Sequence, residues 1–565
     1  MVSHQKQNKR ANIIGLVTAL VTVILLNYVG SFVFKRFDLT TEKRYSLSDA
    51  TKELVNDLED QVYIKVYLEG DLPANYLRLR NATKETLDEI RAYSNGRIDY
   101  IFINPSESPD EKVRNSIYQE LSDKGIQYTN LRSEEGDKQS EQILFPGAIF
   151  AYQGKEIPLQ ILKSQLGSSP EVMLNNSIQQ LEYEIASSIK KLVRPKRQKI
   201  AFLEGHGELD DMHLADIAKT LDEFYTVDRA KLGGKLKSLE DYDAVIIAKP
   251  DTVFSEKDKY ILDQFIMNGG KTMWLLDHVS ASMDSLQKTA TSIGVPVSLN
   301  LEDMLFRYGC RINTNLVLDL QSLPIPVVTG YEGNQPKQEL FPWFFFPLIM
   351  DHPSHPIVSN LDALKTEFVN SLDTAGGKGI KKTILLTSSD RSKIMATPAR
   401  ISLNILRYPP DERQYVKKNI PIAVLLEGEF TSNYKNRLTE EFTSNKQLKF
   451  KETSVSNKMI VVADGDIIKN GVNKERGSIK PLGYDVYTRR TYGNKDFIMN
   501  SLNYLLDDSG LIQARSKEFK IRLLNTQKVD AERQKWQLLN TVIPVILIGL
   551  FGLIQFFIRR RRYSK

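Results

Sequence analysis

The sequence predicts an α/β protein in which two transmembrane helices flank an extracytoplasmic region. That region holds a small domain with a βαβ unit and a larger, doubly wound domain built on a parallel sheet. Two observations predict this class: uncharged apolar stretches lie near both ends of the 565-residue chain, and between them short apolar segments alternate with amphipathic ones. Such alternation is typical of parallel sheets covered by helices on both faces.

The two apolar stretches are Asn12–Phe34 and Trp536–Ile558. Each is long enough for a helix to cross a hydrocarbon core of roughly 30 Å. The first differs from a cleaved signal peptide, because its apolar region is long and no small-x-small cleavage site follows before Lys35. We therefore expect an uncleaved signal anchor at one end and a second span at the other.

Basic residues after the second stretch predict the orientation in the membrane. The tail at 559–565 carries Arg559, Arg560, Arg561, Arg562 and Lys565, and such segments stay in the cytoplasm. Two spans put both termini on one side. We therefore expect an inner-membrane protein with cytoplasmic termini and a large periplasmic domain.

The net charge of +6 does not indicate a nucleic-acid-binding protein. The tails at 1–11 and 559–565 hold eight Lys and Arg residues and no acid, so the rest of the chain carries 6 − 8 = −2. The basic excess therefore marks membrane topology. The single cysteine, Cys310, excludes an intrachain disulfide.

Hydrophobic periodicity and turn residues predict the domain organisation. The expected parts are an N-terminal α/β domain at 37–165, a connecting helix at 170–195, a doubly wound domain at 196–510 and a juxtamembrane stalk at 511–535. The doubly wound domain contains an insertion at about 281–419 that we expect to be rich in loops.

Strands of the larger domain are expected at "KIAFLE", "TVDRA", "YDAVIIAKP", "KTMWLLD", "IPIAVLLEG" and "MIVVADGD". Gly270, Lys271 and Thr272 resemble the end of a phosphate-binding loop, but they precede a strand, whereas such a loop follows one. We therefore expect no nucleotide to be bound by this chain, and we interpret Gly269 and Gly270 as the end of a helix.

A candidate ligand-binding site lies after two of the expected strands. His206 and Glu208 follow the first, and Asp277 and His278 follow another. Ligands of open parallel sheets bind outside the carboxyl ends of the strands, and histidine with carboxylates can hold a metal or perform acid–base chemistry. The alternative, which we favour, is a tight glycine turn whose polar side chains satisfy loop backbone groups. On that interpretation there is no catalytic residue, metal or cofactor.

Two further segments carry unusual residues. The aromatic run "FPWFFFP" at 341–347 is expected to lie in the core of the insertion, and His352 and His355, just after it, are interpreted as loop residues. In the second span, Gly549 and Gly552 leave a strip of small residues, while Pro544 and Gln555 are costly in lipid unless neighbouring helices accommodate them. This span is therefore expected to contact a membrane partner.

Several segments, taken in order, resemble the gliding-motility-associated ABC transporter subunit family GldG. They are "FDLTTEKRYSLSDAT" after the first span, "LEYEIASSIKKL", "FLEGHGE", "HPIVSNLD", "VVADGDIIKNG", "NKDFIMNSLNYL" and the "WQLLNTVIPVILIGLFG" end with its arginines. The resemblance covers nearly the whole chain. It implies that the larger domain is related to class I glutamine-amidotransferase-like folds. No cysteine stands where that fold has its nucleophile, so none of its activity carries over.

The resemblance further implies a non-catalytic, substrate-binding-like auxiliary subunit of an ABC transporter, involved in gliding motility and linked to secretion of surface adhesins. The implied partners are an ABC permease subunit and a cytoplasmic ATPase subunit. Two other hypotheses stay open. One is a periplasmic metal-dependent or acid–base hydrolase that uses His206, Glu208, Asp277 and His278. The other is a membrane-anchored cell-envelope scaffold.

Overall fold

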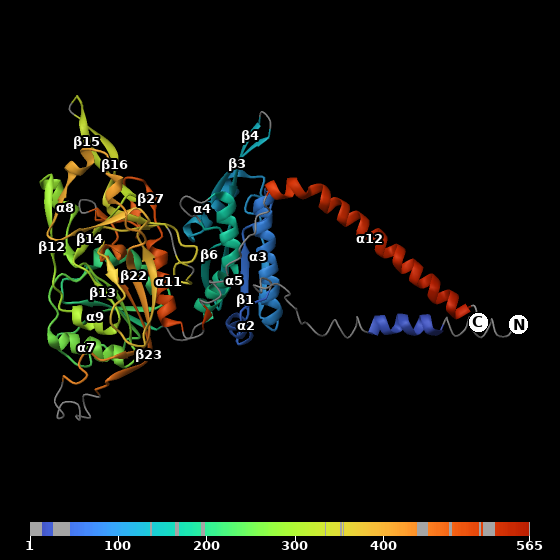
Figure 1. Ribbon diagram of the computed structural model, residues 1–565, viewed down its shortest axis with the longest axis horizontal. Helices are drawn as coiled ribbons and strands as arrows, with labels where there is room; N and C mark the ends of the chain where they lie inside the picture. Colours follow the sequence, from blue (N-terminus) through green and yellow to red (C-terminus); the bar gives the residue numbers. More distant parts are fainter. Residues whose placement is uncertain are drawn as a thin grey trace. The chain divides into compact units, whose positions relative to one another are not determined.

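The computed structural model describes residues 14–25, 46–135, 138–163, 169–193, 198–333, 335–350, 353, 355–437, 450–473, 477–507, 510–511 and 526–563. The chain divides into two compact units, Met1–Lys517 and Glu518–Lys565. The first unit contains an N-terminal domain and a larger central domain, and its strands and helices are labelled in Figure 1.

The N-terminal domain is built on a four-stranded sheet with the order β2-β1-β5-β6. Strands β1 (Val62–Val66) and β2 (Ile98–Phe102) are parallel, with helix α3 (Ala74–Tyr93) between them in the chain, which makes a βαβ unit. Strands β5 (Gly147–Tyr152) and β6 (Lys155–Gln160) complete the sheet in antiparallel pairing. The remaining elements are α2 (Asp49–Asn56), α4 (Glu111–Asp123), β3 (Thr129–Glu135), β4 (Lys138–Leu144) and the long helix α5 (Pro170–Val193).

The central sheet has seven strands in the order β19-β22-β23-β10-β9-β7-β8. The parallel strands are β7 (Lys199–Glu204), β8 (Thr226–Lys231), β9 (Ala244–Ala248), β10 (Lys271–Leu275) and β23 (Thr453–Val462). Strands β22 (Pro421–Thr431) and β19 (Lys381–Thr387) are antiparallel, so the sheet is mixed and the expectation of a parallel sheet is wrong at this edge.

Helices cover both faces of the central sheet, because successive strand residues point to opposite sides. On one face, Phe202 and Ile246 pack with helices α6 (Asp211–Asp222) and α11 (Asn494–Leu506). On the other face, Leu203 packs with helices α7 (Glu256–Met267) and α9 (Glu302–Tyr308). Both faces are therefore buried, as the continuous apolar strands of the sequence predict.

The insertion is rich in strands, so the expectation of a loop-rich segment is wrong. Its aromatic run lies on β16 (Gln335–Ile349), where the Trp343 and Phe345 side chains are fully buried in a separate hydrophobic core. Prolines such as Pro326 and Pro342 are unusual in strands, so the sequence of this segment does not predict a hairpin. A hairpin at the edge of a sheet nevertheless tolerates them. The other elements are β11 (Val279–Ser280), α8 (Met283–Lys288), β12 (Thr291–Pro296), β13 (Arg311–Ile312), β14 (Asn315–Asp319), β15 (Ser322–Glu332), β17 (Leu364–Lys365), β18 (Leu372–Asp373), β20 (Ser392–Ala396) and β21 (Ala399–Ser402).

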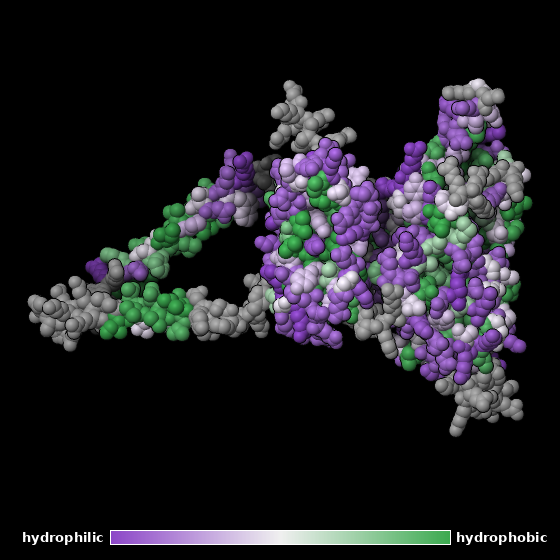
Figure 2. Space-filling view, turned by 180° about the vertical axis from the view of Figure 1, so that it is seen from behind, coloured by the Kyte–Doolittle hydropathy of each residue, from purple (hydrophilic) through white to green (hydrophobic). Residues whose placement is uncertain are grey.

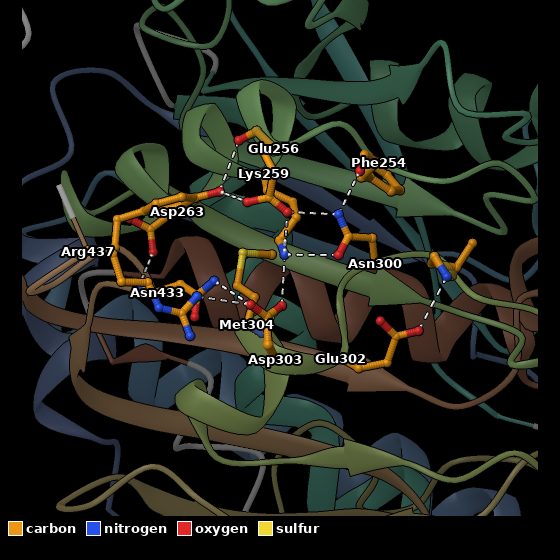
Figure 3. A network of polar contacts seen from close by, with 12 residues as sticks. Phe254, Glu256, Lys259, Asp263, Asn300, Glu302, Asp303, Met304, Asn433 and Arg437 are labelled. Atoms are coloured by element: carbon orange, nitrogen blue, oxygen red, sulfur yellow. Dashed lines mark hydrogen bonds and ion pairs between the residues drawn. The ribbon is translucent and has the colours of Figure 1, made fainter.

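A buried lysine ties the insertion to the central domain (Figure 3). The Lys259 side chain on α7 is 1% exposed, and its Nζ donates to Asp303 Oδ1 of α9 at 2.8 Å and to Asn300 Oδ1 at 3.3 Å. Asp303 also accepts from Asn433 Nδ2 at 2.9 Å, in the segment after β22. Charge-assisted bonds of this kind hold three chain segments in one arrangement.

The second unit is dominated by α12 (Thr526–Tyr563), within which Glu532–Ile558 is long and apolar enough to cross a membrane. The surface of this helix is largely hydrophobic along the span (Figure 2). Near the N-terminus, the described part of the predicted first span is the shorter apolar helix Ile14–Leu25. The rest of that span lies outside the described residues. One apolar helix of spanning length and one shorter one are consistent with membrane anchoring.

Candidate functional site

The carboxyl ends of β7 and β9 lie side by side where the chain order of the central sheet reverses, which is where ligands of open α/β sheets bind. The loops that follow these strands are joined closely. The backbone N–H groups of Asp251 and Thr252 donate to the carbonyl of His206, at 3.0 Å each. Gly207 has φ of +75°, and a Cβ there would overlap the Asp251 carboxylate. The "EGHGE" motif therefore makes a tight turn against its neighbouring loop.

His206 is buried within this turn. Its ring stacks on Phe254 at a centroid distance of 3.8 Å. Its Nδ1 lies 3.4 Å from Glu208 Oε1, and its Nε2 lies 3.4 Å from Asp258 Oδ2. The backbone N–H of His206 donates to Glu208 Oε2 at 2.7 Å. Both ring nitrogens thus face carboxylates of the chain itself, and Phe254 covers one face of the ring.

These carboxylates set the protonation of the histidine. Burial acts to lower the pKa of His206, but the hydrogen bonds and charges of Glu208 and Asp258 outweigh it and raise this pKa above its ordinary value. Burial likewise acts to raise the pKa of Glu208, and its bonds to His206 outweigh burial and lower it. The group is therefore an internal imidazolium–carboxylate pair.

Asp277, after β10, lies in a different group, which we call the Lys249 cluster: Lys249, Asp277, Asp464, Asp466 and Lys469. Lys249 follows β9, and its Nζ lies 3.0 Å from Asp277 Oδ2 and in close contact with Asp466 Oδ2. Lys469 Nζ lies 3.1 Å from Asp466 Oδ1. The cluster therefore joins the carboxyl ends of three neighbouring strands, β9, β10 and β23.

Backbone geometry supports the Lys249 cluster. Lys249 itself has φ of +52°, a conformation that costs energy in a non-glycine residue. The N–H of Gly465 donates to Asp277 Oδ1 at 2.6 Å, and a Cβ at Gly465 would crowd the Lys249 side chain. The N–H of Asp466 donates to Asp464 Oδ1 at 2.8 Å. The turn "ADGD" therefore needs its glycine.

Burial and mutual repulsion separate the pKa values within the Lys249 cluster. Burial, together with the charges of Asp277 and Asp466, raises the pKa of Asp464 well above its usual range. Burial opposes the ionisation of Asp466, but the charge of Lys249 outweighs it and lowers the pKa of Asp466. Burial also acts to lower the pKa of Lys249, and the two carboxylates reverse that shift. Lys249 is thus a cation held by the acids around it.

The space beside the Lys249 cluster is small. A cavity of about 80 Å³ is lined by Lys365, Glu367, Asp466, Lys469 and others. In the described ranges, no group of three or more His, Cys, Asp or Glu side chains is placed to hold a metal ion. The contacts of both groups at this sheet edge tie loops to one another.

The predicted site residues thus fall into separate groups. His206 and Glu208 contact each other, whereas Asp277 contacts Lys249. His278 is buried elsewhere: its backbone N–H donates to Asn370 Oδ1 at 2.7 Å, and burial lowers the pKa of its ring. His355 packs on Tyr504 with a centroid distance of 5.0 Å, and burial lowers its pKa to about 4. His352 lies outside the described residues.

Sequence reasoning missed Lys249, Asp258, Asp464 and Asp466. Three of them carried the same signal as Asp277, because Lys249 follows the apolar strand "AVIIA" and the two aspartates follow "MIVVA". Asp258 carried no such signal, since it lies in the first turn of α7.

Replacing Lys249 by methionine should leave Asp277 buried without a cation and leave Asp466 with Lys469 as its remaining partner. We expect the Lys249→Met variant to lose about 3 kcal/mol of unfolding free energy, because removing one partner of a buried ion pair leaves the charge of the other buried and uncompensated. Denaturant unfolding of the full chain in detergent measures it. The control is Lys381→Met, whose lysine pairs with Glu427 at 3.1 Å but is 72% exposed, and should cost less than about 1 kcal/mol. Equal losses in the two variants would contradict the assignment.

The raised pKa of His206 predicts a pH-dependent stability. A group whose pKa is raised by folding stabilises the fold fully below its unfolded value of 6.5, and this contribution is lost as the pH rises through the folded pKa. We expect the stability advantage of the wild type over His206→Gln to be larger at pH 5.5 than at pH 8.5, measured by denaturant unfolding. A difference that does not change with pH would show that the ion pairs do not form.

Comparisons with known proteins bear on both domains. A protein-family model described as a domain of unknown function (DUF7088) matches residues 41–151, and one described as "ABC-type uncharacterized transport system" matches residues 197–501. An uncharacterized protein of Borreliella burgdorferi is 21% identical over 98% of this chain and 99% of its own length. The solved mmIFT52 N-terminal domain is 13% identical and covers 55% of this chain and 99% of its own, with a TM-score of 0.30, too low to bear on the fold. Because the second model spans more than half of the 565 residues, the protein belongs to this ABC transporter auxiliary family.

Proposed function

We propose that the protein is a non-catalytic, membrane-anchored auxiliary subunit of an ABC transporter. The observation that carries the proposal is the presence, in one chain, of a central domain of the auxiliary family and an apolar helix long enough to cross a membrane. At about 1.5 Å per residue, the 27 residues Glu532–Ile558 exceed the roughly 30 Å of a hydrocarbon core. The function of such a chain is to bring its extracytoplasmic domains to a transporter.

The partners in this proposal are an ABC permease subunit and a cytoplasmic ATPase subunit. Support comes from the turn that resembles a phosphate-binding loop. Gly269 has φ of +99°, its N–H donates to Ile266 O at 3.0 Å, and that of Gly270 donates to Phe265 O at 3.0 Å. The two glycines end α7 and precede β10, so this turn is a helix cap. ATP hydrolysis is therefore assigned to a separate subunit.

The narrower form of the proposal places the transporter in gliding motility and in the secretion of surface adhesins. Its support is the resemblance of segments such as "FLEGHGE" and "VVADGDIIKNG" to the GldG family. The Asp464 and Asp466 of the second segment belong to the Lys249 cluster, so in this protein the motif stabilises the sheet edge. Its presence is therefore evidence of a shared fold, and the transported substrate has to be identified by experiment.

A hydrolase is the second candidate, favoured by the contacts of His206 with Glu208 and Asp258. It has less support, because the side chain of Glu208 is 1% exposed and the His206 ring is covered by Phe254. A substrate has no open approach to either group in this arrangement. A cell-envelope scaffold differs from a transporter subunit in one measurable respect, namely that it would not alter the activity of a partner ATPase.

The proposed topology has both termini in the cytoplasm, and the four arginines after the second span motivate it. Green fluorescent protein fused after Lys565 should fluoresce, and alkaline phosphatase inserted between β3 and β4, near residue 137, should be active. Each reporter works on one side of the membrane only. The proposal fails if phosphatase fused after Lys565 is active.

The second span is proposed to contact the permease. Pro544 lies inside α12, and a Cβ added at Gly549 or Gly552 would meet no atom of the described part of the chain within 4 Å, so the small-residue strip is open to another helix there. Replacing 536–558 by a leucine–alanine helix of equal length, with the arginines kept, should preserve insertion but abolish copurification of the permease.

The matched control for this replacement exchanges 12–34 for the same leucine–alanine sequence. We expect the control to retain the permease at wild-type levels in an affinity purification from membranes. If the permease is lost with the control and kept with the first replacement, the contact lies at the other end of the chain and the assignment to Gly549 and Gly552 is wrong.

A further inference from the structure

A large cavity lies within the first unit, away from the strand ends described above. Its volume is about 490 Å³, within the range of small-molecule sites. It lies where α5 and β6 meet the ends of α6 and α11. Its lining residues include Tyr183, Lys191, Phe224, Tyr225, Leu506 and Leu511.

Lys191 is the distinctive residue of this cavity. Its Nζ lies 4.1 Å from the centroid of the Phe224 ring, and among the described residues it makes no ion pair. Desolvation lowers the pKa of Lys191. Two other lysines of the lining differ, because Lys124 Nζ lies 3.0 Å from Glu156 Oε2 and Lys190 Nζ lies 2.6 Å from Asp507 Oδ1. Among the described residues Lys191 therefore has no ion-pair partner, although the charges of Glu184, Glu223 and Asp496 partly offset its desolvation.

The remaining lining restricts what an anion at Lys191 can be. Tyr183, Tyr225 and Leu506 are buried apolar surfaces, and the hydroxyl of Tyr225 already donates to Asn503 Oδ1 at 2.7 Å. Lys124 and Lys190 of the lining are already paired with Glu156 and Asp507, and Glu223 adds another carboxylate, which disfavours a polyanion such as a nucleotide. A single negative charge on an apolar body fits both features.

We propose that this cavity binds an amphipathic monoanion, with its carboxylate at Lys191 and its apolar body against Phe224 and Leu506. The proposal goes beyond the transporter assignment and does not depend on it. Leu192, one residue on from Lys191, packs in the core of the N-terminal domain, whereas Leu506 packs in the core of the central domain. A bound ligand would therefore contact both domains, and its binding would be coupled to their association.

The test is isothermal titration of the full chain in lipid nanodiscs with 3-phenylpropionate, corrected for empty nanodiscs. We expect saturable binding with a Kd of about 1 mM or lower, the scale of a small ligand with one charge and one ring. The neutral analogue 3-phenylpropionamide should bind at least tenfold more weakly, because it lacks the charge that Lys191 compensates.

Variants assign the binding to Lys191. Lys191→Met should weaken 3-phenylpropionate binding at least tenfold, whereas Lys84→Met, which removes an exposed lysine of α3 outside this lining, should leave it unchanged. Thermal unfolding confirms that both variants fold. The proposal is overturned if the wild type shows no saturable binding, if the amide binds as tightly as the acid, or if both variants weaken binding equally.

Discussion

The ion pairs of Lys249 are the interaction on which the carboxyl edge of the central sheet depends. Parallel strands end at one edge, so β10 and β23 bring Asp277, Asp464 and Asp466 together where water is largely excluded, and like charges repel strongly there. Lys249 follows β9, the strand next to β10, and supplies the compensating cation despite a φ of +52°. The same contacts hold Asp277, after which the chain enters the insertion.

Much of the central domain follows from sequence periodicity. The apolar strand β7 begins at the expected residue, because a continuous apolar run is a local signal. The direction of β22 is not local, since "IPIAVLLEG" has the same composition whichever way it runs. The hairpin of β15 and β16 was hidden by its prolines, although the burial of its aromatic run was expected.

The candidate site, like the fold, could be predicted from the sequence only in part. Histidines and carboxylates after strands draw attention in a sequence, and His206 with Glu208 does form a contact pair. Asp277 was selected for the same reason, but its partner is Lys249, and only the strand order β9-β10-β23 reveals that pairing. Acidic and basic side chains at the edge of a sheet therefore do not by themselves indicate catalysis, because here their charges compensate one another.

We propose that this chain serves a transporter and does not itself hydrolyse ATP. The most direct measurement is the rate of ATP hydrolysis by the copurified permease and ATPase in proteoliposomes, with and without the full chain, alongside the chain alone. The account predicts no hydrolysis by the chain alone and a changed rate when it joins its partners. An unchanged rate with the chain stably bound, or ATP hydrolysis by the purified chain itself, would contradict it.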